Sequence, residues 1–230
     1  MPAGKLRLVA RAKPRPRAAL SKKQKSEVRK LAASVVSSMA EDINKVFVVE
    51  NEQLDHNKPA YVGNLLATEQ GVSDDNTQSS KKVRKGDKIT LKNLNIRFWL
   101  SNKLDRPNVM YKGVLFWYQS GVALSDAIVY FTQTNKILDR YNTEKIRILD
   151  QFIVKPGPMF LNGTEKFEHS YLATLNKSYK RKIITYDENG TVPKGWDIGF
   201  ALVAYDAYGT LQTDNIASFA YNVKLTFEDL

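Results

Sequence analysis

Residues 88–100 read KITLKNLNIRFWL, and apolar and polar side chains alternate along almost the whole segment. Alternation with a period of two is typical of a β-strand with one buried face. The phase changes once, because Ile89 and Leu91 are out of step with Leu94 and the apolar residues that follow it. A β-bulge near Asn93 would restore the register. We therefore predict a long, bulged strand whose apolar side chains all face one core.

The same period of two continues from about residue 46 onward. Residues 112–119 (KGVLFWYQ) and 198–205 (IGFALVAY) are apolar runs of strand length, and residues 219–227 alternate again. Continuous apolar runs of this length are consistent with strands that are buried on both faces. Seven or eight strands, with no convincing helix after residue 45, predict a β-sandwich or a β-barrel.

The residues before this region follow a helical period. Ser21 is a candidate N-cap for an amphipathic helix over residues 21–45. Lysines near the start of this helix oppose its dipole, so we expect the helix to form fully only against an anion or a partner. The alternative is an ordinary helix packed on the core. The predicted apolar stripe consists of Val28, Leu31, Val35, Met39 and Ile43.

Charge is concentrated at the N-terminus. The net charge is +11, and residues 1–30 hold eleven of the 35 basic residues but only one acid, Glu27. This segment therefore carries a net charge of +10, and the rest of the chain carries +1. Pro14 and Pro16 interrupt any helix in residues 1–20, and a dense block of like charge stays disordered by itself. We predict a basic disordered arm over residues 1–20 whose partner is a polyanion, with a solubilising tail or a nuclear-import signal as alternatives.

Three basic clusters are candidates for contact with nucleic acid. The first spans the arm and the start of the predicted helix, and the second precedes the strand at 88–100. The third is at residues 180–182. The second and third clusters could each face nucleic acid or be solvated loop charge. The predicted nucleic-acid-binding residues are Lys5, Arg7, Arg11, Lys13, Arg15, Arg17, Lys22, Lys23, Lys25, Arg29, Lys30, Lys81, Lys82, Arg84 and Lys85.

The chain lacks most of the residues and motifs on which catalytic sites commonly depend. There is no cysteine, and the two histidines, His56 and His169, are isolated in sequence. The chain has no phosphate-binding loop and no dinucleotide-binding glycine motif. No apolar run approaches the roughly 18 residues that cross a bilayer. We therefore expect no enzyme, no cofactor and no membrane partner, and we assign no residue as a metal ligand.

Two segments resemble the capsid proteins of small icosahedral viruses. Residues 84–100 (RKGDKITLKNLNIRFWL) and 140–154 (RYNTEKIRILDQFIV) are similar to segments of capsids from circular Rep-encoding single-stranded DNA viruses and from satellite tobacco necrosis virus. The resemblance implies one eight-stranded jelly-roll β-sandwich over residues 46–230, an all-β fold class. It also implies a T=1 shell of about 60 copies with the arms inward. The acidic calcium ligands of the satellite capsids have no assigned counterpart here, so calcium binding stays open.

The function predicted from the sequence is therefore a viral capsid protein that self-assembles and packages a single-stranded genome. The arm also resembles a nuclear-import signal, which favours DNA over RNA, host import receptors as partners, and location in the virion and the host nucleus. The first alternative is a non-assembling single-stranded nucleic-acid-binding module, which requires aromatic residues exposed in a basic groove. The second is an enzyme or a lectin on a jelly-roll scaffold, which would not explain the arm.

Overall fold

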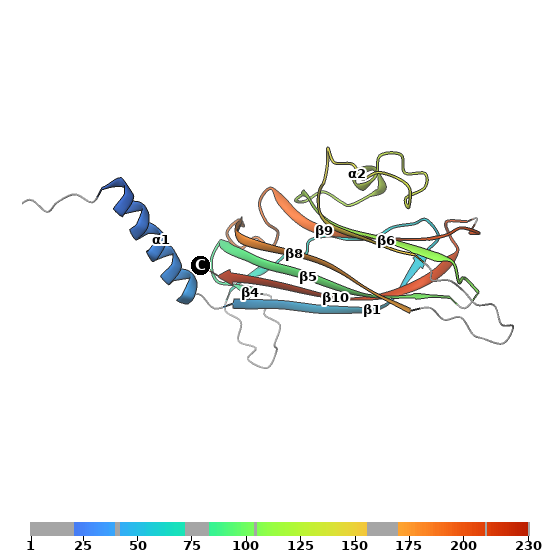
Figure 1. Ribbon diagram of the computed structural model, residues 1–230, viewed down its shortest axis with the longest axis horizontal. Coiled ribbons are helices and arrows are strands. Elements are labelled where there is room, and N and C mark those ends of the chain that lie inside the picture. Colours follow the sequence, from blue (N-terminus) through green and yellow to red (C-terminus); the bar gives the residue numbers. More distant parts are fainter. Residues whose placement is uncertain are drawn as a thin grey trace, which may run out of the picture. The chain divides into compact units, whose positions relative to one another are not determined.

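The computed structural model divides the chain into an N-terminal unit that ends at Met39 and a C-terminal unit, here called the body (Figure 1). The predicted arm, Lys81 and Lys82 lie outside the described residues. The described residues are 21–39, 42–71, 83–103, 105–155, 170–209 and 211–229.

The N-terminal unit contains helix α1, Lys22–Met39. The prediction of a helix over 21–45 is therefore wrong at its C-terminal end, because strand β1 begins at Asp42. Ile43, which the helical spacing placed on the apolar stripe, is instead buried in β1 opposite Phe227. Hydrogen bonding to the neighbouring strand and burial in the core outweigh the helical pattern at this position.

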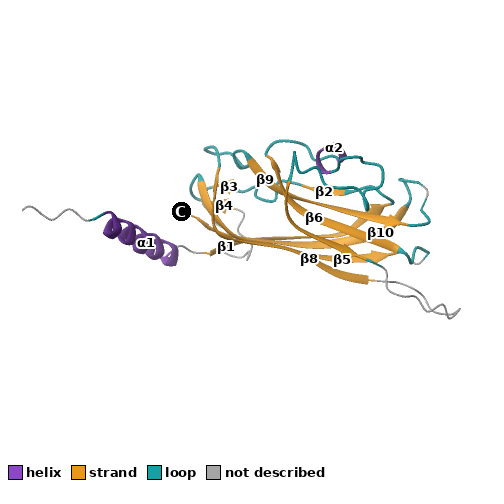
Figure 2. Cartoon of the chain, turned by 45° about the horizontal axis from the view of Figure 1, so that its top comes forward, coloured by secondary structure: helices purple, strands orange, loops and turns teal. Residues whose placement is uncertain are grey.

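The body consists of two four-stranded antiparallel sheets (Figure 2). The first sheet has the order β1-β10-β5-β8, with β1 at Asp42–Asp55, β10 at Asn215–Asp229, β5 at Lys88–Asn102 and β8 at Ser170–Thr185. The second sheet has the order β2-β9-β6-β7, with β2 at Ala60–Val62, β9 at Trp196–Asp206, β6 at Val109–Gln119 and β7 at Arg147–Val154. A short parallel pair, β3 (Glu69–Gln70) and β4 (Val83–Arg84), lies apart from both sheets in the hydrogen-bond pattern.

The connections between these strands define a jelly roll. The chain crosses from one sheet to the other between all eight successive strands of the two sheets except β6 and β7, which are neighbours in the second sheet. Two interleaved four-stranded sheets with long connections across the sandwich are characteristic of a jelly roll. The predicted all-β, eight-stranded jelly-roll sandwich is thus confirmed.

The core lies between the two sheets and contains a cluster of aromatic rings. Phe98 of the first sheet contacts Phe200 and Phe152 of the second, with ring centroids 5.2 and 5.5 Å apart. Tyr221 on β10 packs edge-on against Phe200 at 5.1 Å. Such pairs are favourable beyond the apolar area they bury, so the cluster fixes the two sheets against each other.

The predicted bulge in residues 88–100 is also confirmed. On β10, Thr226 pairs with Asn93 and the next residue, Phe227, pairs with Leu91, so Lys92 is the extra residue. Because of this bulge, Ile89 and Leu91 face the same core as the later apolar residues of β5, and each is fully buried.

The outer faces of the two sheets differ. A segment that contains the short helix α2 (Asp126–Val129) covers the outer face of the second sheet, where Val129 and Tyr130 pack with Phe116 in a separate apolar cluster. This cover explains why residues 112–119 and 198–205 are apolar on both faces. The described residues provide no such cover for the outer face of the first sheet, which carries alternating polar residues and several exposed apolar ones, among them Val48, Trp99 and Leu172.

A buried carboxylate lies at the start of β9. Asp197 is fully buried, and its Oδ1 accepts hydrogen bonds from the backbone amides of Leu66 (3.2 Å) and Ile198 (2.6 Å). The ammonium of Lys45, which donates to the carbonyl of Ala67 at 2.6 Å, provides the nearby positive charge. Burial nevertheless dominates and raises the pKa of Asp197 from 3.8 to about 6.

This raised pKa predicts a pH-dependent stability. Between pH 4 and pH 6 the folded state holds a proton that the unfolded state has released, so the unfolding free energy should fall by up to about 3 kcal/mol as the pH rises through this range. Asp197→Asn should remove this component. Chemical denaturation of both proteins across the range measures the difference, and parallel curves would contradict the assignment.

The alternating register makes a second prediction. Phe98→Ala should lower the unfolding free energy of the unassembled protein by about 3–5 kcal/mol, because it removes a buried ring between the sheets. Asn95→Ala, on the outer face of the same strand, should change it by less than about 0.5 kcal/mol. Equal losses in denaturant titrations would show that β5 does not have the described register.

Candidate nucleic-acid interface

Helix α1 begins with a reciprocal cap. The side chain of Gln24 accepts a hydrogen bond from the amide of Ser21 at 3.0 Å, and the hydroxyl of Ser21 accepts one from the amide of Gln24 at 3.3 Å. This is the geometry of a capping box, which satisfies two amides that have no partner within the helix. The predicted capping role of Ser21 is confirmed, and it fixes the start of the basic part of the helix.

The first half of α1 presents a basic surface. No acidic residue lies in its first turn, so the lysines there are unfavourable with the helix dipole and would be stabilised by an anion. At 3.6 residues per turn, most of the basic residues lie on the side away from the apolar stripe, and Lys25 lies at its border. Val28, Leu31 and Val35 of the stripe are each more than half exposed. The exposed basic residues are Lys22, Lys23, Lys25, Arg29 and Lys30.

The two described residues of the second basic cluster, Arg84 and Lys85, differ in exposure. Lys85 is exposed, and its backbone amide donates a hydrogen bond to the carboxylate of Asp229. Arg84, in contrast, is completely buried. The prediction that Arg84 binds nucleic acid is therefore corrected, because its guanidinium is enclosed by protein and lies away from the surface.

Arg84 has a structural role. The carbon at the centre of its guanidinium lies 4.2 Å from the ring centroid of Tyr186, and its Nη2 donates to the carbonyls of Asp187 (3.2 Å) and Gly190 (2.6 Å). A guanidinium above an aromatic ring is attracted by the electrons of the ring face. Arg84 thereby anchors the turn that follows β8.

The third basic cluster is on β8. Lys180, Arg181 and Lys182 are all exposed. The Nζ of Lys182 lies 5.6 Å from the ring centroid of Trp117, so its ammonium group interacts with an aromatic ring of the body. These three residues are thus surface cations on β8.

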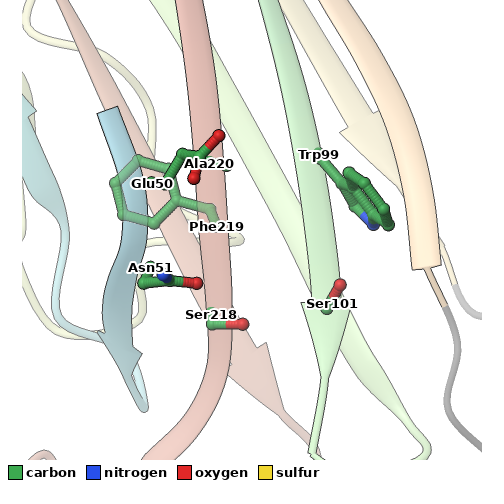
Figure 3. A pocket seen from close by; sticks show the side chains of 7 residues that line it. All are labelled: Glu50, Asn51, Trp99, Ser101, Ser218, Phe219 and Ala220. Carbon is green, nitrogen blue, oxygen red and sulfur yellow. The ribbon is translucent and has the colours of Figure 1, made fainter. Parts of the chain in front are cut away.

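A groove on the outer face of the first sheet was not predicted from the sequence. Figure 3 shows a groove with Trp99 and Ser101 of β5 on one side, Glu50 and Asn51 of β1 on the other, and β10 between them. Trp99 is 58% exposed. Trp99 lies between the core residues Phe98 and Leu100 in the alternating segment 88–100, so the sequence pattern could have placed its ring outside the core.

Sites of other kinds are not found among the described residues. No three histidine, aspartate or glutamate residues there come close enough to hold a metal ion. Within the same part of the chain, no helix is long and apolar enough to cross a bilayer. His56 is buried beside Tyr205, and its Nδ1 accepts a hydrogen bond from the amide of Asp206 at 3.2 Å.

Comparison with known proteins assigns no family to the chain. No protein-family model matches the chain, and no curated protein matches its sequence. A chain from the crystal structure of the T13 IBDV viral particle is similar over 83% of this chain and 36% of its own length, with 11% identity and a TM-score of 0.23. The strand order and the packing of the two sheets, rather than this likeness, define the fold.

The different positions of Arg84 and Lys85 generate a prediction. Arg84→Met should lower the unfolding free energy by about 1.5–3 kcal/mol, since the charged hydrogen bonds of a buried guanidinium are lost. Lys85→Met removes the same charge from an exposed side chain and should change stability by less than about 0.5 kcal/mol. Thermal and denaturant unfolding measure both effects. An Arg84→Met variant with unchanged stability but weakened nucleic-acid binding would instead show that Arg84 contacts nucleic acid.

Proposed function

We propose that this protein is a capsid protein that assembles into a small closed shell, of T=1 symmetry with about 60 copies, and packages a single-stranded genome. The observation that carries the proposal is the separation of charge from fold. Nearly all of the net positive charge precedes a jelly-roll body that is itself close to neutral. A neutral body can pack against its own copies, while the cationic segment neutralises phosphates without reading bases.

Exposed apolar side chains on the loops support self-association. Leu138 (79% exposed) and Phe131 (48%) lie in the segment between β6 and β7, and Tyr208 (78%) and Leu211 (59%) lie between β9 and β10. Apolar residues gathered at exposed loops favour contacts between proteins. In the proposed shell these loops contact neighbouring copies.

The charge of residues 1–30 is of the right order for a small genome. About 60 copies with ten net charges each in this segment supply roughly 600 positive charges, each able to displace a counterion from a phosphate. Encoding 230 residues takes at least about 690 nucleotides, so the charge of these segments and the minimum genome charge are of the same order. A longer genome would need small cations or basic residues of the body.

The arm also bears on the type of genome and on the host compartment. Its similarity to an import signal supports a host nuclear stage, import receptors as partners and a DNA genome. The protein would act in the virion as a structural component, without enzymatic activity. One observation favours the alternative of a non-assembling single-strand binder, namely the exposed Trp99 beside the cationic Arg97 on the body.

Replacing Arg11, Lys13, Arg15 and Arg17 together by alanine tests the role of the arm. In the log–log plot of affinity against salt, the slope for a single strand should become shallower by about 2.8, from roughly 0.7 per phosphate contact. Empty shells should still form, with less nucleic acid inside. Absorbance ratios of purified particles and binding titrations at several salt concentrations measure both effects.

A matched control removes four charges from exposed positions of the body, at Lys88, Lys103, Lys145 and Lys155. This variant should package normally. If both variants package alike, or if the arm variant packages as much as the original protein, the arm does not bind the genome and the proposal fails.

A further inference from the structure

The outer face of the first sheet carries an isolated aromatic side chain. Trp99 points away from the core, opposite Ala220 on β10 and Leu172 on β8. The residue is 58% exposed, and its ring makes no contact with another aromatic ring among the described residues. An exposed tryptophan face of this kind can stack on a planar ligand.

The residues beside Trp99 form a groove that fits a planar ring. Figure 3 shows the small side chains of Ser218 and Ala220 along its floor, between Trp99 on one side and Glu50 on the other. The groove has a volume of about 270 Å³, close to the lower end of the ~300–1,000 Å³ typical of small-molecule sites. Asn51, at a φ of 61°, marks the bulge in β1 that shapes the wall of the groove.

Two cations lie on the same face, outside the groove. Arg97 is the next outward residue of β5 and is paired in register with Asn222 and Thr174. Lys224, one row further along β10, lies opposite Asn95. Both cations are exposed, and neither makes an ion pair with any described residue.

The acidic residues of this face are at its ends. Glu50 lies at the groove, where a carboxylate can accept hydrogen bonds from an amino group of a base. At the opposite end, Asp42 and Glu228 are neutralised by Lys92, whose Nζ lies 2.7 and 2.5 Å from their carboxylate oxygens. The central rows therefore combine two cations, which make no ion pair with a described residue, with amide and hydroxyl side chains and with the exposed Val48 of β1.

We propose that this face is a second contact with the packaged strand, in addition to the arm. A base stacks on Trp99 above Ala220, Arg97 and Lys224 contact the adjoining phosphates, and Glu50 accepts a hydrogen bond from the amino group of the base. The inference rests on the proposed packaging function and assigns the first sheet to the inner side of the shell.

The charge of this face favours nucleic acid over a second copy of the chain as its partner. The central part of a protein–protein interface is depleted in charged residues, whereas this face holds two cations with no acidic partner in their rows. Contacts with single strands combine such cations with an aromatic platform. The chemistry of the face therefore favours nucleic acid.

The test is binding of oligo(dC) to the full chain at several salt concentrations. Trp99→Ala should weaken binding about 5- to 150-fold, the value of one base stack, with no change in the log–log salt slope. Trp99→Phe keeps an aromatic face and should recover much of the loss. Arg97→Gln should instead make the slope shallower by about 0.7, since one phosphate contact is lost.

Trp196→Ala is the matched control. Trp196 is 40% exposed on the second sheet, and the guanidinium of Arg147 lies 5.0 Å from its ring centroid. This variant should bind as the original protein does. If Trp99→Ala binds equally well, the inference is wrong. If it impairs shell formation without nucleic acid, the face is a contact between copies. Failure of the original chain to bind oligo(dC) at all would contradict the packaging function itself.

Discussion

The pairing of β10 with β1 on one side and β5 on the other is the constraint on which the rest of the structure depends. Successive side chains along a strand point to opposite faces, so this pairing places Phe98 and Tyr221 in the core and Trp99 and Ala220 outside it. A one-residue slip would exchange the two sets. The bulge at Lys92 preserves the arrangement over the full length of β5. Core packing and the proposed base site are thus two consequences of one register.

The second organising feature is the separation of functions along the chain. The cationic residues that precede the body have almost no opposing charge among them, and the body has a well-packed core that needs none of them. The two outer faces of the body are also specialised. A segment with α2 covers the second sheet, whereas no described segment of the body covers the face with Trp99, Arg97 and Lys224. A shell-forming protein needs such an asymmetry, because its inner and outer surfaces meet different partners.

The sequence predicted the all-β sandwich, the bulge and the cap at Ser21, because each depends on residues close together in the chain. It misplaced the end of the helix, since the burial of Ile43 depends on β10, about 180 residues away. It misassigned Arg84 for the same reason, because Tyr186 and the carbonyl of Gly190 come from a distant turn. The exposed Trp99 was within reach of the alternation pattern, but the groove beside it requires β1 and β10. Assembly and genome type stay predictions.

Electron microscopy of the purified full chain is the decisive experiment. A capsid protein should form uniform closed shells of about 60 copies that enclose single-stranded nucleic acid, which nuclease reaches only after the shells are opened. A monomer in gel filtration that binds oligonucleotides without forming particles would contradict the capsid function and favour the single-strand-binding module.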